Sequence, residues 1–384
     1  MARKKIIYVW KSPYPWDVRV EKICKSLSKE YEVLILARWG GETKKAEQID
    51  GITVKRVGFK KKAIYSTPLS INPIWKKELE KVVKGYKPDL IIVREIMLGT
   101  LVGRISEKYN IPTIMDMAEN YPALMKLWRK YNNSFLKRIV MQTLDIPKRV
   151  EKTSVSLMSR IIVVCEEQIH RLSNSYNYSI DKVQIVKNTP ELKDNNKNNS
   201  NSISNRITFL HHGWLTEEKR IDNFIHAFIN SYKNNENFQL NIAGNGNCID
   251  EYKKLAFGTN NINFLGEYKY DELDDIISAT SIGILPYEIN DFNNFTIHNK
   301  LFDYFALSKP VIVSQAKPLA RVVKQTNAGF IFDCSSIDSI EKHFKTIDYK
   351  LIETLGKNAY KAYIDRYNWE EDEKNLLKFV EEVI

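Results

Sequence analysis

The sequence predicts an α/β fold built from two similar parallel-sheet domains. Short apolar runs that are typical of strands alternate with amphipathic helical patterns along most of the 384 residues. The chain is longer than one hydrophobic core usually serves, so two domains of about 150–200 residues are expected. A polar, Asn- and Ser-rich run at Lys193–Asn205 interrupts the alternation and has the composition of a linker.

The first domain is expected to span residues 1–190. Its first strand, Ile6–Trp10, precedes an amphipathic helix at Arg19–Glu30. Because strands alternate with helices, they should pair in parallel, with helices on both faces of the sheet. The further strands are predicted at Glu32–Ala37, Ile52–Val57, Leu90–Val93, Thr113–Met117, Arg160–Val164 and Val183–Val186.

The second domain is expected at residues 206–364, after a linker at 191–205. Residues 365–384 form a helical pattern with an apolar face that includes Trp369 and Leu376. A helix that follows a finished domain must bury that face, and packing back towards the first domain is one solution. The strands of the second domain are predicted at Ile207–His211, Gln239–Ala243, Ile262–Leu265, Ile282–Pro286 and Val311–Ser314.

The net charge of +11 is unevenly placed. The first 190 residues contain 36 Lys and Arg against 19 Asp and Glu, a net charge of +17, so the remainder carries −6. Such asymmetry indicates a partner surface on the first half, with nucleic acid and anionic membrane as the candidates. No nucleic-acid recognition motif accompanies the charge, which favours the membrane.

The composition also bears on compartment and metals. No apolar run reaches the ~18 residues of a transmembrane helix, and the N-terminus lacks the features of a signal peptide. The four cysteines are scattered and neither they nor the six histidines have metal-ligand spacing, which predicts core thiols in a reducing cytosol and no metal site.

The stretch Ser281–Ser314 combines the features of a ligand site. It predicts a strand, an Asn-rich loop, a helix that opens near Asn299, and a second strand. The free N–H groups of such a helix suit a phosphate, and Asp303, one turn inside it, can accept hydrogen bonds from sugar hydroxyls. Phosphate together with hydroxyls indicates a nucleotide-sugar, although many such units hold no ligand. His298 is a further candidate in this loop.

A second phosphate candidate follows the first strand of the second domain. Gly213 ends that strand, and Lys219 and Arg220 stand at the start of the next helix, where cations oppose the helix dipole. An anion between them would remove this cost, as in a diphosphate clamp. The alternative is two solvated surface cations. Gly244 follows the next strand in a short glycine turn, which is weak evidence for phosphate binding.

Two candidates lie in the first domain. Asp17 is the expected N-cap of the first helix, and it places Arg19 in the first turn, near the carboxyl end of the sheet where ligands bind. The alternative is a surface pair between Asp17 and Arg19. Asp116 and Glu119 follow another strand, at a position that suits hydroxyl or amine recognition, with helix capping by Asp116 or Asn120 as the alternative.

Two basic segments, Phe59–Lys87 and Leu124–Lys152, interleave cations with large apolar residues such as Trp75. This pattern suits the headgroup boundary of an anionic membrane. Ordinary solvated helix faces with apolar backs are the alternative.

Several segments together resemble the retaining nucleotide-sugar glycosyltransferases of the GT-B fold, glycosyltransferase family four. The resemblance covers nearly the whole chain and implies two Rossmann-like domains facing across a cleft. The segments are DVRVEKICKSLSKEYEV, VVCEEQIHRL, DKVQIVKNTPEL, FLHHGWLTEEKRIDNFIHAF, FLGEYKYDELDDIISATSIGILPY and NKLFDYFALSKPVIVS.

The resemblance implies roles for single residues. Lys219 would bind the donor diphosphate, with Arg220 as a second charge, and Asp303, the second acid of the family's E-x7-E motif, would bind the ribose. The reaction itself is expected to depend on Lys219, Arg220, Asp116 and Glu119. Donor binding is expected to involve Arg19, Gly213, Gly244, Thr296, His298, Asn299, Lys300 and Asp303, with backbone N–H groups of Phe295–His298 on the phosphates.

Three positions depart from the family pattern. Phe295 replaces the first motif acid, Trp214 an Arg of the phosphate element, and Ala118 a sugar-binding His. A donor sugar that lacks the hydroxyl contacted by this His, such as a 6-deoxy sugar, is one expectation.

The resulting expectation is a glycosyltransferase that moves a hexosyl or deoxyhexosyl group, without a metal or other cofactor, from a UDP- or GDP-linked sugar. The acceptor would be lipid-linked or a polysaccharide, in surface glycan synthesis. The protein would be cytoplasmic and peripheral on the inner face of the plasma membrane, and would not bind nucleic acid. Alternatives are a nucleotide-sugar epimerase of the same fold and a non-catalytic, glycosyltransferase-like binding subunit.

Overall fold

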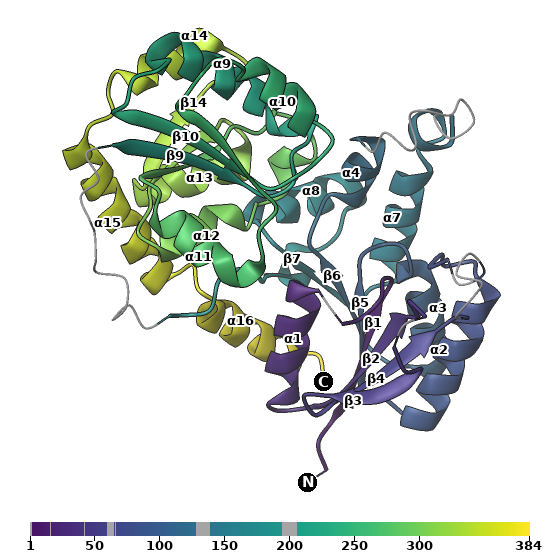
Figure 1. Cartoon of the computed structure of the whole chain (residues 1–384). Helices are drawn as coiled ribbons and strands as arrows, with labels where there is room; N and C mark the ends of the chain where they lie inside the picture. The colour runs from purple at the N-terminus through teal and green to yellow at the C-terminus, as the bar shows by residue number, and fades with distance from the viewer. Residues whose placement is uncertain are drawn as a thin grey trace. The chain divides into compact units, whose positions relative to one another are not determined.

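The computed structural model describes residues 2–15, 17–41, 43–59, 65, 67–127, 139–193 and 206–384. The chain forms two compact units (Figure 1). Unit 1 consists of Met1–Asn188 together with Asp372–Ile384, and unit 2 of Thr189–Glu371. Most of the predicted linker, residues 194–205, lies outside the described residues.

Unit 1 is a sheet of order β3-β4-β2-β1-β5-β6-β7-β8 with helices on its faces. All its strand pairs are parallel except that of β3 with β4. Its elements are β1 Lys5–Trp10, α1 Val18–Ser28, β2 Glu32–Arg38, β3 Ala46–Ile49, β4 Ile52–Val57, α2 Pro73–Tyr86, β5 Leu90–Arg94, α3 Gly99–Tyr109, β6 Thr113–Met117, α4 Tyr121–Leu127, a π-helix Ile139–Thr143, α7 Ile146–Ser156, β7 Arg160–Val163, α8 Glu166–Tyr176, a 3-10 turn Ile180–Lys182 and β8 Val183–Ile185.

Local sequence signals explain where the helices of unit 1 begin. Asp17 caps α1, and its carboxylate accepts hydrogen bonds from the N–H groups of Arg19 and Val20, as predicted. Asn72 caps α2 in the same way, with Pro73 in the first turn where its missing N–H costs nothing.

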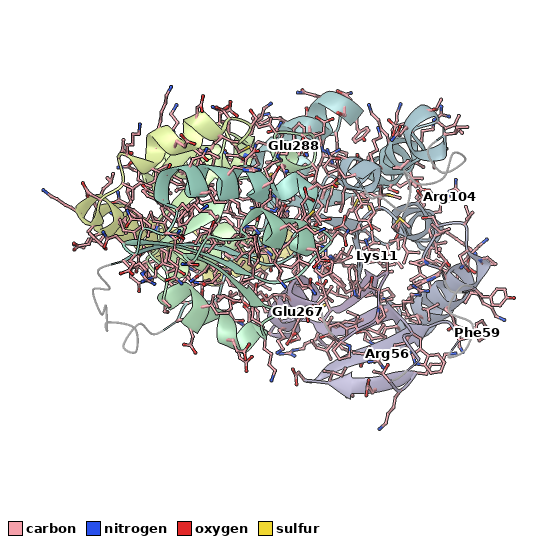
Figure 2. All side chains as sticks on the ribbon, turned by 45° about the horizontal axis from the view of Figure 1, so that its top comes forward. Lys11, Arg56, Phe59, Arg104, Glu267 and Glu288 are labelled. Atoms are coloured by element: carbon pink, nitrogen blue, oxygen red, sulfur yellow. The ribbon has the colours of Figure 1, made fainter. Side chains whose placement is uncertain are left out.

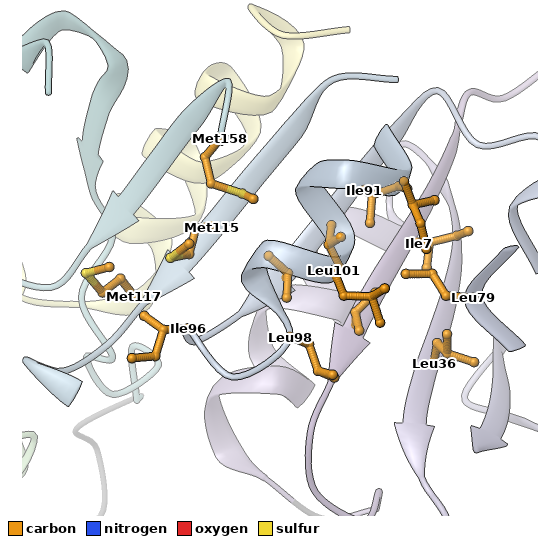
Figure 3. Close-up of a cluster of buried hydrophobic side chains, with 14 of the residues drawn as sticks. Ile7, Leu36, Leu79, Ile91, Ile96, Leu98, Leu101, Met115, Met117 and Met158 are labelled. Carbon is orange, nitrogen blue, oxygen red and sulfur yellow. The ribbon is translucent and has the colours of Figure 1, made fainter. Parts of the chain in front are cut away.

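A continuous apolar cluster fills the space between the unit 1 sheet and its helices (Figure 3). Ile7, Leu36 and Ile91 come from neighbouring strands, and Leu79 and Leu101 from α2 and α3. The strands are buried on both faces, which is why they are apolar runs without alternation.

Unit 2 is a fully parallel sheet of order β11-β10-β9-β12-β13-β14. Its core is rich in aromatic side chains, with Phe209 in ring contact with Phe224, Phe228 and Phe344. Its elements are β9 Ile207–His212, a 3-10 turn Glu217–Lys219, α9 Ile221–Tyr232, β10 Phe238–Ala243, α10 Ile249–Leu255, β11 Ile262–Gly266, a 3-10 turn Tyr270–Glu272, α11 Leu273–Ser278, β12 Ile282–Leu285, a 3-10 turn Asn293–Phe295, α12 Lys300–Ala306, β13 Val311–Ser314, α13 Lys317–Thr326, β14 Gly329–Phe332, α14 Ile337–Phe344, α15 Tyr349–Asp365 and α16 Trp369–Glu381.

The last helix, α16, begins in unit 2 and continues into unit 1. Leu376, Phe379 and Val380 are buried. Glu373 pairs with Lys29 of α1 at 2.6 Å, and Glu382 pairs with Arg160 of β7 at 3.0 Å. Residues 372–384 therefore belong to the packing of unit 1, although they come last in the chain.

The structure confirms an α/β fold with two parallel-sheet, Rossmann-like halves. It adds two edge strands that the sequence analysis missed, β3 and β14. One feature of the membrane prediction is wrong: Trp75 is fully buried in the core of unit 1 and cannot contact a bilayer. Of the segment Leu124–Lys152, residues 128–138 lie outside the described residues. None of the described helices is both long and apolar enough to cross a membrane.

Candidate functional site

The candidate residues of unit 2 gather at the carboxyl ends of neighbouring strands. β9 pairs with β10 on one side and β12 on the other, all in parallel. Gly213 and the turn that carries Lys219 follow β9, and the loop that leads to α12 follows β12. In open parallel sheets this edge is where ligands bind.

Gly213 and Lys300 are in direct contact. Gly213 has φ +106°, and a Cβ built there would lie 2.4 Å from Cε and 2.7 Å from Nζ of Lys300. Burial lowers the pKa of the Lys300 ammonium, and the carboxylate of Asp303 opposes this shift. Three predicted residues are therefore brought together, and the ammonium lies over the backbone at the end of β9.

Gly244 allows two backbones to approach. Its φ is +119°, and a Cβ there would lie 2.1 Å from the carbonyl oxygen of Gly213. The N–H of Gly213 donates to Ala243 O at 2.8 Å, and that of Gly244 to Gly266 O at 2.6 Å. Gly244 thus shapes the turn beside Gly213, and its contact with a donor stays a prediction.

Lys219 is buried, with only 8% of its surface exposed, so the alternative of a solvated cation is wrong for this residue. Its Nζ lies 4.2 Å from the centre of the Tyr287 ring, a cation–π contact. Arg220 is more open and pairs loosely with Asp222 at 3.5 Å, with φ +50° at the N-cap position of α9.

His298 lies at the centre of the loop after β12. Its Nε2 is 2.9 Å from Oδ1 of Asn293, which can only accept, so Nε2 carries the hydrogen. The ring also packs edge-on against Tyr287, with centroids 4.2 Å apart. Burial lowers the pKa of His298 well below its ordinary value, and the charges of Lys219 and Lys300 lower it further. The imidazole is therefore neutral at physiological pH.

Two histidines at the end of β9 belong to the same environment. His211 Nδ1 is 3.2 Å from the carbonyl oxygen of Ile284, which requires an N–H there and leaves Nε2 as an acceptor. Burial, followed by the charge of Lys300, lowers the pKa of His211 to about 3. His212 Nδ1 lies 3.0 Å from the Tyr268 hydroxyl. Burial, followed by the charge of Lys300, also lowers the pKa of His212.

Several buried polar atoms near these residues have no hydrogen-bond partner within the described part of the chain. They are Nε2 of His211, Nε2 of His212, the Tyr287 hydroxyl and Oγ1 of Thr296. Buried polar groups are nearly always paired, so such a group of unpaired atoms marks a place where a polar ligand completes the hydrogen bonding. Of these four residues, only Thr296 is among the donor-binding residues predicted from the sequence.

The helix that carries Asp303 is short. α12 has seven residues, and Asn299 at its N-cap position is exposed and makes no side-chain capping bond. Asp303 is half-buried, and its charge adds to the effect of burial in raising the pKa values of Tyr268 and Tyr270. A carboxylate and two phenols therefore share one region beside the lysines.

The unit 1 candidates Arg19 and Asp116 are bound to each other. Arg19 Nε and Nη2 donate to Asp116 Oδ1 at 2.9 and 2.6 Å, and the Tyr8 hydroxyl donates to Oδ2 at 2.7 Å. Burial would raise the pKa of Asp116, but Arg19, with Arg94 and the Tyr8 hydroxyl, outweighs burial and holds the pKa below its ordinary value. The Arg19 and Asp116 side chains are both buried, so the alternative of a surface pair between Asp17 and Arg19 is wrong; the Asp17 carboxylate pairs instead with Arg94 at 2.6 Å.

Asp116 lies inside β6, one residue before its end, and not after the strand as predicted. The polar residues that do follow β6 have different surroundings. Glu119 is half-buried, and Asn120 accepts a weak hydrogen bond from Ala123 N at 3.4 Å, in agreement with a capping role at α4. Across the described ranges, His, Cys, Asp and Glu form no group that could hold a metal ion.

Comparisons with known proteins agree with this architecture. Residues 193–362 match the family Glycosyl transferases group 1. No curated protein sequence matches the chain.

Three solved structures are similar over almost the whole chain. Sucrose-phosphate synthase from Thermosynechococcus elongatus has a TM-score of 0.76 at 14% identity, covering 99% of both chains. HepE from Anabaena, solved in complex with UDP-glucose, has a TM-score of 0.70 at 11% identity, covering 98% of this chain and 99% of that one. WaaG, a glycosyltransferase involved in lipopolysaccharide biosynthesis, has a TM-score of 0.67 at 12% identity, covering 97% and 99%.

The chain therefore carries a Glycosyl transferases group 1 domain at residues 193–362 and has the GT-B fold of the solved glycosyltransferases.

Proposed function

We propose that the protein is a retaining, metal-independent glycosyltransferase that uses a nucleotide-diphosphate sugar, with UDP or GDP as the nucleotide. The transferred group is a hexosyl or deoxyhexosyl residue, and the acceptor is lipid-linked or a glycan in surface polysaccharide synthesis. The observation that carries the proposal is the pair Lys219 and Lys300, held among neutral imidazoles at the carboxyl edge of the unit 2 sheet.

This arrangement suits a diphosphate leaving group. Both lysines lower the pKa of His298, which means that their positive potential extends over the same space. Donors and charges that are fixed before the reaction stabilise the negative charge that develops when the glycosidic bond to the diphosphate breaks. Lys219 and Lys300 supply the charge, and Arg220 is placed to add a third cation.

The remaining residues fit the rest of the donor. Asp303 can accept hydrogen bonds from the ribose hydroxyls. The unpaired Nε2 of His211 can accept from a hydroxyl or N–H group, the unpaired Nε2 of His212 is a further polar contact, and Thr296 can donate to a phosphate oxygen. HepE, of the same fold, binds UDP-glucose, which supports a uridine nucleotide as the first to test.

The surface of unit 1 supports a peripheral position on the inner face of the plasma membrane. Phe59 and Ile71 are exposed, Ile71 by 88% (Phe59 is labelled in Figure 2). Ile71 stands two residues before α2, whose Lys76 and Lys77 are also exposed. Apolar side chains beside lysines suit the boundary of an anionic bilayer. Flotation with vesicles that contain phosphatidylglycerol, compared with phosphatidylcholine alone, tests this; Ile71→Ser should reduce binding.

Nucleotide binding tests the function. We expect UDP or GDP, but not CMP, to raise the unfolding temperature, with about 2.7 kcal/mol of stabilisation at 100 times the Kd. Lys219→Met should weaken binding at least tenfold, while Lys254→Met on the exposed face of α10 should leave it unchanged. Absence of a shift with every nucleotide would overturn the proposal. Isomerisation of the donor sugar without any acceptor would instead identify an epimerase.

A further inference from the structure

Three ionisable side chains follow neighbouring strands of unit 1 at the carboxyl edge of its sheet. Lys11 comes directly after β1, Glu95 directly after β5, and Glu119 two residues after β6. β1 pairs with β5, and β5 with β6, with Val9 opposite Val93, so Lys11 and Glu95 lie at the same level of the sheet. This edge is the ligand-binding edge of open parallel sheets. Lys11 is labelled in Figure 2.

Two features of Glu95 reduce the stability of the folded protein when no ligand is bound. Its backbone is left-handed, with φ +66°, which side chains other than glycine rarely adopt. Its side chain is 2% exposed, and Oε2 has no hydrogen-bond partner among the residues that the structure describes. Strained backbone and an unpaired buried oxygen persist together mainly where a ligand uses them.

Lys11 provides donors beside this carboxyl group. Its ammonium hydrogen-bonds to the Tyr121 hydroxyl and lies 4.0 Å from the centre of the same ring. An ammonium has three donors, and the hydroxyl takes one of them. The neighbouring cation, Arg94, is held differently: it pairs with Asp17 at 2.6 Å and stacks over Trp10 at 4.6 Å.

The charges of this cluster decide the class of ligand. A phosphate would require an excess of cations, which the cluster does not have. A carboxyl group beside an ammonium can instead bind a neutral hydroxyl, one group accepting and the other donating. The carboxyl groups of the cluster are those of Asp17, Glu95, Asp116 and Glu119, and its cations are those of Lys11, Arg19 and Arg94.

We propose that Glu95 and Lys11 bind a hydroxyl group of a neutral sugar acceptor, with Glu95 as the residue that positions it. This inference rests on the proposed function, since it assigns the acceptor side of the same reaction. It assigns acceptor recognition to a cluster without an excess of cations, and it assigns membrane contact to the separate basic surface around α2.

The protonation of Glu95 agrees with hydroxyl binding. Burial raises the pKa of Glu95 to about 8; Lys11 and Arg94 oppose this shift, and Glu119 and Asp116 add to it. Near neutral pH the group can therefore donate or accept a hydrogen bond, as a hydroxyl can. The amide of a glutamine at this position can likewise donate and accept a hydrogen bond, whereas the thioether of a methionine cannot donate and accepts only weakly.

The test compares sugar binding with nucleotide binding in the full chain. The probes are octyl glucoside, octyl galactoside and octyl mannoside, with octyl phosphate as the anionic counterpart, titrated by saturation-transfer NMR. We expect Glu95→Met and Lys11→Met each to weaken glycoside binding at least tenfold. Glu95→Gln should stay within about threefold of wild type, and Glu107→Met, on the exposed side of α3, should match it.

UDP and GDP binding, followed by thermal shift, should be unchanged in all four variants. Equal glycoside affinity in wild type and Glu95→Met, tighter binding of octyl phosphate than of the glycosides, or no glycoside binding by wild type would each overturn the inference. Failure of wild type to bind any nucleotide would overturn the proposed function instead, and the two failures are therefore distinguishable.

Discussion

The side chain of Lys300 crosses Gly213 so closely that a Cβ at position 213 would lie 2.4 Å from Cε of the lysine. The contact joins the end of β9 to the first residue of α12. Glycine satisfies two requirements there, since the backbone has φ +106° and the space of a side chain is already occupied. The position of Lys300, for which we propose donor binding, thus depends on the absence of a side chain at Gly213, directly after β9.

Gly213→Ala should therefore displace Lys300 and weaken UDP binding by at least tenfold. Gly258→Ala is the matched control, because Gly258 also has positive φ, +76°, but nothing lies within 4 Å of its Cβ position. Both replacements should cost about 1 kcal/mol of stability from the left-handed backbone. Titration of UDP against the unfolding temperature separates the two effects, and equal loss of UDP affinity in both variants would contradict the assigned contact.

Gly283→Ala should destabilise unit 2 by overpacking. A Cβ at Gly283 of β12 would lie 2.4 Å from the Tyr304 ring, which is fully buried and anchored by its hydroxyl to Leu210 O at 2.7 Å. Forced shifts in a packed core typically cost 1–3 kcal/mol. Urea unfolding measures this cost. Gly85→Ala in α2, with open space around the Cβ, should instead raise stability by up to about 1 kcal/mol.

The carboxyl group of Glu95 should make the protein less stable as the pH rises. Burial raises its pKa from 4.5 to about 8, so between these values the folded state holds a proton that the unfolded state releases. Stability from this group is present below pH 4.5 and is lost as the pH rises through 8, with a slope of at most about 1.4 kcal/mol per pH unit.

Glu95→Gln removes the titration and should flatten this part of the profile. The measurement is urea unfolding of wild type and Glu95→Gln at pH 5, 6.5 and 8. The free energy of unfolding of the variant, relative to that of wild type, should increase at each step. A constant difference between the two proteins across this range would mean that the Glu95 carboxyl titrates near its ordinary pKa.

Hydrophobic patterning predicted most of the sheet, because strands that are buried on both faces are continuous apolar runs. It missed β3, whose sequence AEQI is short, polar and half-exposed, although the Asp50–Gly51 turn that follows is a hairpin signal. The same patterning explains Trp75: with Leu79, Val82 and Val83 it forms one buried face of α2.

Pairing between distant residues could not be predicted in the same way. Arg19 and Asp116 are 97 positions apart, and each was a ligand-binding candidate on its own local pattern. In the folded protein, the hydrogen-bonding groups of Arg19 and Asp116 are paired with each other. His211 and His212 show a second limit, because the sequence of β9 gives no sign that one ring nitrogen of each histidine is buried without a partner among the described residues.

The path of α16 bears on how the protein is made. Unit 1 consists mostly of residues 1–188, yet its packing includes residues 372–384, which the ribosome adds only after all of unit 2. During synthesis, the surface that receives Leu376, Phe379 and Val380 must wait while all of unit 2 emerges. Completion of the first sheet unit is thereby coupled to synthesis of the whole of unit 2, and a nascent chain that stops before residue 372 leaves that apolar surface open to chaperones.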